Sequence, residues 1–211
     1  MYKRRQYNWN DGKTLTINTS TLVMGILNGT PDSFSDGGKY NTPEAAVEHT
    51  KKLISDGADI IDVGVESTRP GSTPISVEEE LERMQLLLPH IIATASVPIS
   101  VDTYRGRTAE YALSKGAHII NDIWGFRQDP EVASIIAQYR VPVILMHNQR
   151  ENKYDDIIDD MKAYFFRSVD IAEKAGVNPY NIWLDPGIGF AKDFEQNIEV
   201  LHRLDELAAF E

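Results

Sequence analysis

Short apolar runs alternate along this chain with longer segments whose apolar residues recur at helical spacing. Each apolar run stops at a polar residue, and a loop rich in Gly, Pro, Ser or Asp follows several of them. Runs of this length and composition predict buried strands. The six predicted strands end at or next to Asn28, Val65, Asp102, Asn121, His147 and Asp185.

The segments between these runs carry the signals that begin and end helices. Thr42-Pro43 begins one, with Thr as N-cap and Pro in the first turn, and Gly57 ends it. Ser76 with Glu79 forms a capping-box pattern, and Pro89 is expected to interrupt or end the helix that follows. The remaining predicted helices span 105–115, start at 129–130, and span 156–175 and 195–209.

A hairpin is predicted ahead of the first buried strand. The short runs Gln6–Trp9 and Thr14–Asn18 flank the turn sequence Asn10-Asp11-Gly12. We expect this hairpin to cover one end of the main core. The predicted organisation is therefore a hairpin at 1–20 and one α/β unit at 21–211.

Alternating strands and helices imply a parallel sheet covered by helices. An open doubly wound sheet and a (β/α)₈ TIM barrel both satisfy this pattern. Six strand–helix units in 211 residues fall short of the eight units and about 250 residues of a typical barrel. The barrel is still favoured, because almost every strand ends in a residue able to bind a ligand. An open sheet instead gathers its site at one switch point.

Charge and composition narrow the possible partners. The net charge of −11 disfavours nucleic acid, which needs a basic surface, and no apolar run reaches membrane length. There is no cysteine, so disulfides and thiolate metal sites are excluded. Lys3, Arg4 and Arg5 are followed by polar residues, unlike a signal peptide, so a cytoplasmic location is expected.

The polar strand ends suggest a specific chemistry. Asp102, Asn121 and Asp185 offer short acceptors and one amide donor, which suit a flat heterocycle carrying several N–H groups. Asn28 offers a neutral oxygen to Mg²⁺, and Arg69 is a natural anion clamp. Taken singly, Asn28 is more typical of a turn, and His147 and His118 of structural hydrogen bonding. Only the joint pattern indicates a site.

Six segments closely resemble the dihydropteroate synthases, the folate-pathway enzymes that sulfonamides inhibit. The matching segments are 24–38, 66–71, 100–104, 120–122, 145–148 and 185–190, and the resemblance covers the chain from about residue 22 onward. It implies a (β/α)₈ barrel that joins 6-hydroxymethyl-7,8-dihydropterin diphosphate to p-aminobenzoate and releases pyrophosphate. It further implies Mg²⁺ as cofactor, sulfonamide inhibitors as ligands and a homodimer in the full-length form.

The same resemblance implies roles for particular residues. The implied pterin pocket comprises Asp102, Asn121, Asp185, Ile123, Met146 and Phe190. Asn28 is the implied Mg²⁺ ligand. The implied diphosphate and aminobenzoate loops carry Thr68, Arg69, Pro70, Phe34 and Asp36. Asp102 and Arg69 are the implied catalytic residues, in a largely dissociative mechanism that stabilises departing pyrophosphate and a cationic pterin methylene.

Two departures from the family pattern bear on activity. Gly29 stands where an aliphatic residue is expected. The sequence also stops at Glu211, before the family's Ser-Arg-Lys and Arg-x-His segments, so we expect a fragment of a longer enzyme with weak or no activity alone. The alternatives are a pterin-dependent methyltransferase domain, disfavoured by the two loops, and a non-catalytic pterin-binding protein.

Overall fold

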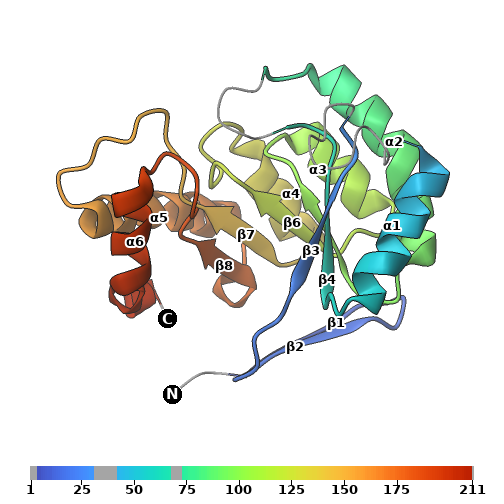
Figure 1. Cartoon of the computed structure of the whole chain (residues 1–211), viewed down its shortest axis with the longest axis horizontal. Coiled ribbons are helices and arrows are strands. Elements are labelled where there is room, and N and C mark those ends of the chain that lie inside the picture. Colours follow the sequence, from blue (N-terminus) through green and yellow to red (C-terminus); the bar gives the residue numbers. More distant parts are fainter. Residues whose placement is uncertain (1–3, 31–41, 68–72, 211) are drawn as a thin grey trace.

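Six parallel strands form one sheet in the order in which they occur along the chain (Figure 1). The computed structural model describes residues 4–30, 42–67 and 73–210. Strictly sequential order is that of a barrel wall, whereas a doubly wound sheet reverses direction at its switch point. The predicted barrel architecture, with six of its eight units in this chain, is thereby confirmed. The strands are β3 (Met24–Asn28), β4 (Ile60–Gly64), β5 (Ile99–Asp102), β6 (Ile119–Asp122), β7 (Val143–Met146) and β8 (Ile182–Asp185).

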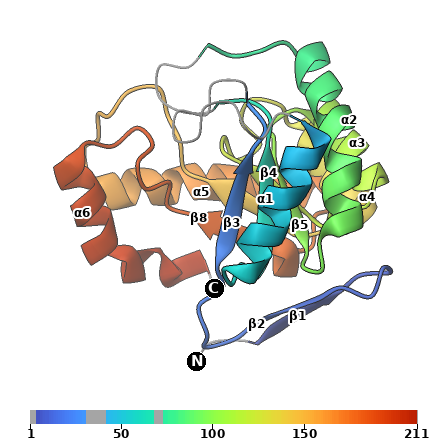
Figure 2. The same cartoon turned by 45° about the vertical axis from the view of Figure 1, so that its right-hand side comes forward.

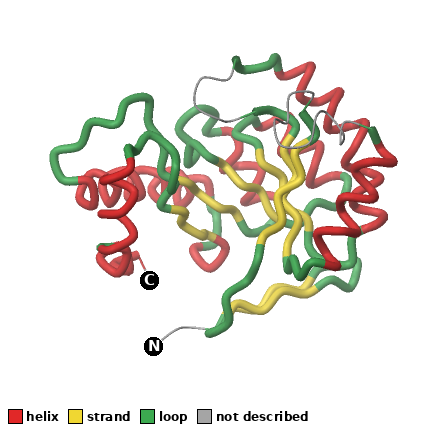
Figure 3. Tube along the Cα trace, in the orientation of Figure 1, coloured by secondary structure: helices red, strands yellow, loops and turns green. Residues whose placement is uncertain are grey.

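Helices cover the outer side of this curved sheet (Figure 3). Among the described residues, no helix combines the length and apolar character needed to cross a bilayer. The helices are α1 (Pro43–Ser55), α2 (Val77–Thr94), α3 (Gly106–Ser114), α4 (Glu131–Tyr139), α5 (Ile157–Ala175) and α6 (Phe194–His202), with 3₁₀ turns at Pro179–Asn181 and Leu204–Phe210.

The main core lies between the outer face of the sheet and the helices. Alternate strand residues such as Leu27, Val63 and Val101 pack there against Met84 and Ile91 of α2, all with no exposed surface. Because side chains alternate across a strand, the neighbouring residues face the barrel interior. The residues that line the interior are therefore set by the register of the outer core.

A second apolar layer closes the amino end of the barrel interior. The hairpin of β1 (Arg5–Asn8) and β2 (Thr14–Ile17) lies beneath the sheet in both views (Figure 2). Its Tyr7 and Leu15 pack with Ile60, Ile119 and Ile144 of the strands. The hairpin therefore covers this end of the sheet, and access to the interior is left to the carboxyl end.

Two predicted helix boundaries are wrong. Helix α2 continues through Pro89, because that residue is exposed while Met84, Leu87, Leu88 and Ile91 anchor the helix on the sheet. The packing outweighs the one backbone hydrogen bond that proline removes. The last predicted helix is two elements, α6 and a 3₁₀ helix that begins at Leu204. The N-caps Thr42 and Ser76 are confirmed, each accepting a backbone N–H.

Candidate functional site

Polar side chains converge at the carboxyl end of the sheet, where the register places four residues side by side. Asn28 pairs with Gly64, Gly64 with Asp102, and Asp102 with Asn121. Residues in register on adjacent parallel strands face the same side of a sheet. An added Cβ at Gly64 would lie 3.5 Å from Oδ2 of Asp102 and 3.7 Å from Oδ1 of Asn28, so both oxygens face the space above this glycine.

Asp62 belongs to this cluster, although it was not among the predicted site residues. It lies inside β4 and is buried, and its Oδ2 accepts a hydrogen bond of 3.1 Å from Nδ2 of Asn121. The sequence signal was the carboxylate within the apolar run Ile60-Ile-Asp-Val-Gly64. A charge inside a buried strand needs a partner or a ligand, so this signal points to the barrel interior.

Besides the Ser100 hydroxyl, three buried carboxyl and amide oxygens at this end have no hydrogen-bond partner among the described residues. They are Oδ1 of Asp62, Oδ1 of Asp102 and Oδ1 of Asn121. Most buried polar atoms in folded proteins have a partner, and leaving one without costs about 1–3 kcal/mol. Three such acceptors in one cluster form a surface suited to a ligand rich in N–H donors.

The carboxylates of the cluster disfavour one another's charge. Burial raises the pKa of Asp102 well above its usual value, and the charges of Asp62, Glu80, Asp122 and Glu66 raise it further. Burial also raises the pKa of Asp62; the Ser100 hydroxyl and the Asn121 amide oppose this shift, and the charge of Asp185 adds to it. A donor or a positive charge brought into this space would therefore stabilise the ionised carboxylates.

Asp185 completes the cluster from β8, where it pairs with Met146 of β7. Its Oδ1 accepts the Gly187 N–H at 2.7 Å, and this bond orders the turn that follows. Of the other predicted pocket residues, Ile123 and Met146 are buried directly after or at the end of their strands, and Phe190 is half-buried in the turn. The predicted pocket residues all lie at the carboxyl end of the sheet.

Asn28 fits the role of a single protein ligand to Mg²⁺. Its oxygen faces the same space as Asp102, and Mg²⁺ keeps most of its waters and needs one or two protein oxygens besides substrate phosphate. No group of three or more His, Asp or Glu side chains suited to a metal occurs among the described residues.

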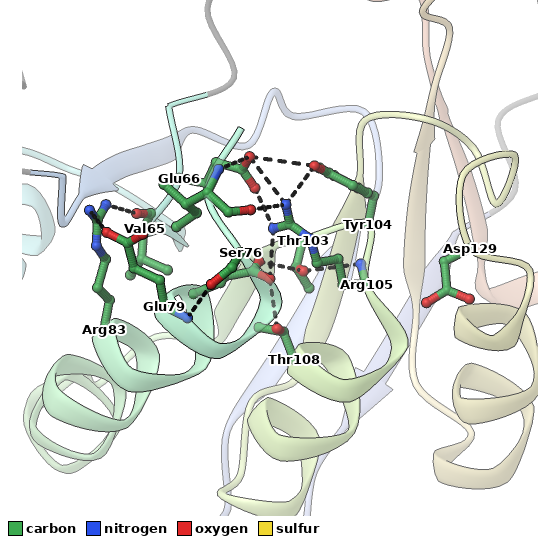
Figure 4. A network of polar contacts seen from close by, with 12 residues as sticks. Val65, Glu66, Ser76, Glu79, Arg83, Thr103, Tyr104, Arg105, Thr108 and Asp129 are labelled. Carbon is green, nitrogen blue, oxygen red and sulfur yellow. Dashed lines mark hydrogen bonds and ion pairs between the residues drawn. The ribbon is translucent and has the colours of Figure 1, made fainter. Parts of the chain in front are cut away.

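A network of buried charges forms the rim beside Asp102 (Figure 4). Arg105 forms ion pairs with Glu66 and with Glu80, the latter at 2.9 Å, and donates to the Ile75 carbonyl at 2.9 Å. Glu80 also accepts the Thr103 hydroxyl at 2.7 Å. This network joins the end of β4, the start of α2 and the turn after β5, so it fixes the segment that follows Asp102.

Five predicted residues lie outside the described ranges: Phe34, Asp36, Thr68, Arg69 and Pro70. Their roles stay predictions. His147 is buried directly after β7, and burial lowers its pKa to about 3, with the charges of Lys192 and Arg127 adding to the effect. The structural role expected for His147 agrees with this environment.

Comparison with known proteins identifies the family. Residues 24–211 match the family described as pterin binding enzyme. Dihydropteroate synthase of Bacillus subtilis is 51% identical over 191 residues, which are 90% of this chain and 67% of that protein.

Two solved dihydropteroate synthases share the fold. The Clostridium difficile enzyme with pteroic acid has a TM-score of 0.85 and 48% identity over 90% of this chain and 73% of its own. The Yersinia pestis enzyme with a sulfonamide drug has a TM-score of 0.87 and 38% identity over 93% and 74%. The chain therefore belongs to the pterin-binding enzymes and, among them, to the dihydropteroate synthases, which are transferases.

Proposed function

We propose that the carboxyl end of this sheet binds a dihydropterin diphosphate and promotes transfer of its methylene carbon to the amine of p-aminobenzoate. The observation that carries this proposal is the set of three partnerless buried oxygens on Asp62, Asp102 and Asn121. The amino-pyrimidinone edge of a pterin presents several N–H donors in one plane. Carboxylate and amide oxygens are the groups that accept such donors.

Each residue of the cluster has a role in this proposal. Asp185 and Asp62 accept N–H groups of the pterin edge, and Asn121 supplies both a donor and an acceptor. Met146, Ile123 and Phe190 form the walls of the ring pocket. Asp102 faces the developing cationic methylene as the C–O bond to diphosphate breaks, and its negative charge stabilises that cation.

The diphosphate leaves on the side of Asn28. Asn28 would hold Mg²⁺ through its side-chain oxygen, and the ion would supply positive charge to neutralise the diphosphate. We further propose that Thr68, Arg69 and Pro70 contribute to the diphosphate and aminobenzoate sites, together with Phe34 and Asp36. The aminobenzoate nitrogen then attacks the methylene carbon and loses a proton.

The sulfonamide-bound relative supports a further part of the proposal. The Yersinia pestis enzyme was solved in complex with a sulfonamide drug, and we propose that sulfonamides occupy the aminobenzoate site of this protein. Assembly as a homodimer belongs to the same proposal, and sedimentation of the purified protein tests it.

Calorimetry with 6-hydroxymethylpterin, alongside an assay of pyrophosphate release, tests the proposed function. We expect the wild-type chain to bind the pterin, and Asn121→Leu and Asp185→Asn each to weaken binding by about tenfold or more. Asn121→Leu removes both a donor and an acceptor, and Asp185→Asn removes a charged acceptor, whose hydrogen bond is worth about 1.5–3 kcal/mol. Asp170→Asn, at an exposed position on α5, is the matched control and should bind as wild type. Absence of pterin binding by the folded wild-type chain would refute the proposal.

The pyrophosphate assay separates an enzyme from a non-catalytic pterin-binding protein. Release that depends on both substrates and on Mg²⁺ supports transferase activity of the 211-residue chain. Pterin binding without release identifies this chain as a binding unit. The chain spans about two thirds to three quarters of the length of the relatives that it matches, which makes this second outcome worth measuring directly.

A further inference from the structure

The ammonium group of Lys192 makes three hydrogen bonds, one for each of its donors. It contacts Nδ1 of His147 at 3.0 Å, the Gly187 carbonyl at 3.0 Å and the Phe190 carbonyl at 3.1 Å. These three partners, a ring nitrogen and two backbone carbonyls, carry no negative charge. Burial lowers the pKa of this lysine to about 8, with the charge of Asp185 opposing the effect. A half-buried lysine bonded only to neutral acceptors serves to position them.

These acceptors come from the ends of two adjacent strands. His147 directly follows β7, whereas Gly187 and Phe190 lie in the turn after β8. The backbone N–H of His147 also donates to the backbone carbonyl of Asp185 at 2.9 Å. Lys192 therefore joins the two strand ends on which Met146 and Asp185 lie.

Gly187 allows these two ends to approach closely. Its φ is +67°, and an added Cβ would lie 2.2 Å from the His147 carbonyl oxygen and 3.2 Å from Cγ of Met146. Only glycine fits this conformation and this contact. The Gly187 N–H donates to Asp185 and its carbonyl accepts from Lys192, so this residue transmits the position of the ammonium to the Asp185 carboxylate.

The contact with Lys192 also determines the tautomer of the His147 ring. An ammonium group has no acceptor, so Nδ1 of His147 must be the acceptor and the ring proton lies on Nε2. A neutral ring in this tautomer agrees with the low pKa of His147. His147 is thus a fixed acceptor that anchors Lys192, and it is not placed to exchange protons with a substrate.

We propose that Lys192 is a positioning residue of the pterin pocket, acting through the Gly187 and Phe190 carbonyls to fix Asp185 and Phe190 relative to Met146. This inference rests on the proposed function and adds to it a residue that contacts no substrate. Without the ammonium, three acceptors lose their common donor, and the turn at 187–190 loses its link to His147. The ring pocket would then be ordered only when the ligand binds, at a cost in affinity.

Chemical rescue at position 192 tests this proposal. The chain has no cysteine, so Lys192→Cys can be alkylated at that position alone. We expect Lys192→Cys to bind 6-hydroxymethylpterin about tenfold more weakly than wild type, the effect of losing a charged hydrogen bond. Alkylation with 2-bromoethylamine, which rebuilds an ammonium on a side chain of nearly the same length, should restore most of the affinity. Iodoacetamide, which adds a neutral group, should not. Equal affinity in all three forms would overturn the proposal.

Two further measurements separate this inference from the proposed function. Lys174→Cys, alkylated in the same ways at an exposed position of α5, should bind as wild type throughout. ¹⁵N NMR of the His147 ring needs no ligand. It should report the Nε2–H tautomer in the wild type and a shifted Nδ1 signal in Lys192→Met. If the wild type binds no pterin, the proposed function fails, while an unchanged Nδ1 signal in Lys192→Met would still refute the role of Lys192.

Discussion

The two ends of the barrel interior differ in how their polar groups are satisfied. At the amino end, the Trp183 indole donates to Tyr7 at 2.9 Å, and the Tyr7 hydroxyl donates to the Tyr180 carbonyl at 2.8 Å. Both ring nitrogens of His118 have partners, the Ile99 N–H at 3.0 Å and the Asp11 carboxylate at 3.1 Å. At the carboxyl end, three buried carboxyl and amide oxygens have no partner among the described residues, and the carboxylates raise one another's pKa.

This difference separates stability from function along a single sheet. The satisfied amino end contributes free energy of folding, because its polar groups keep hydrogen bonds while apolar surface is buried. The carboxyl end gives some of that free energy up, since partnerless acceptors and crowded charges are costly until a ligand arrives. Removal of a crowded, partnerless group at the carboxyl end should therefore stabilise the protein, whereas removal of a satisfied group at either end should destabilise it.

The largest effect is expected at the rim, where the carboxyl end carries satisfied charges. Arg105→Met should destabilise the protein by about 3–5 kcal/mol, because it leaves Glu66 and Glu80 buried without their cation. Urea unfolding measures this loss. This result would refine the comparison of the two ends. It would show that a polar group stabilises the fold when it has a partner, whichever end of the barrel interior it occupies.

Arg107 is the matched control for Arg105. It lies two residues further along, and its ion pair with Glu78 is exposed. Exposed pairs contribute little to stability, so Arg107→Met should unfold at nearly the wild-type urea concentration. Similar unfolding of the two variants would contradict the assigned role of the buried network.

A cavity at the amino end should be the next largest effect. Leu15→Ala removes a buried side chain from the hairpin layer and should cost about 2–5 kcal/mol. Thr14→Ala, at the exposed neighbouring position, should change little. The pterin affinity of the folded Leu15→Ala protein should equal that of the wild type. A loss of affinity that accompanies the loss of stability would contradict the proposed separation between the two ends.

Asp62→Asn at the carboxyl end should instead stabilise the protein, by about 1 kcal/mol near neutral pH, because it removes a buried charge crowded by others. The pKa of Asp62 is raised on folding, so wild-type stability falls as pH rises from the unfolded value of about 4 through the folded value. This fall should be smaller in the variant. Urea unfolding between pH 4 and 7 measures it, with exposed Asp56→Asn as control, and reduced stability of Asp62→Asn would contradict the prediction.

The sequence was sufficient for features that depend on neighbours along the chain. Strand ends such as Asn28 and Asp102 were predictable, because parallel strands deliver their carboxyl ends to one edge. The N-cap Thr42 was predictable from its own first turn. Sequential strand order distinguished the barrel from an open sheet, but the alternation of elements alone did not.

Features that depend on distant partners were missed. Asp62 faces Asn121, which lies 59 positions later, and Lys192 contacts His147 across 45 positions. Arg105 meets Glu66 across 39. The pattern of residues within one segment does not identify partners that lie so far away in the sequence. The helix end predicted at Pro89 was wrong for a related reason. Tertiary packing of α2 on the sheet outweighs the local preference of proline to end a helix.

The smallest expected effect concerns His118 at the amino end, where stability should depend on pH in the opposite sense from Asp62. Burial lowers the pKa of His118, and the Asp11 carboxylate opposes this. The folded state therefore binds fewer protons than the unfolded state, and stability is lost as pH falls from about 6.5 toward the folded value. Protonation would also remove Nδ1 as the acceptor of the Ile99 N–H.

His118→Gln should flatten this part of the pH profile, because a glutamine oxygen can accept the Ile99 N–H at every pH. We expect the wild type to lose about 0.5–1 kcal/mol between pH 7 and 5 through this residue, an amount comparable to one hydrogen bond. The difference between the two proteins at each pH isolates the contribution of His118 from that of the carboxylates. A difference that stays constant with pH would mean that the pKa of His118 does not change on folding, and it would contradict this prediction.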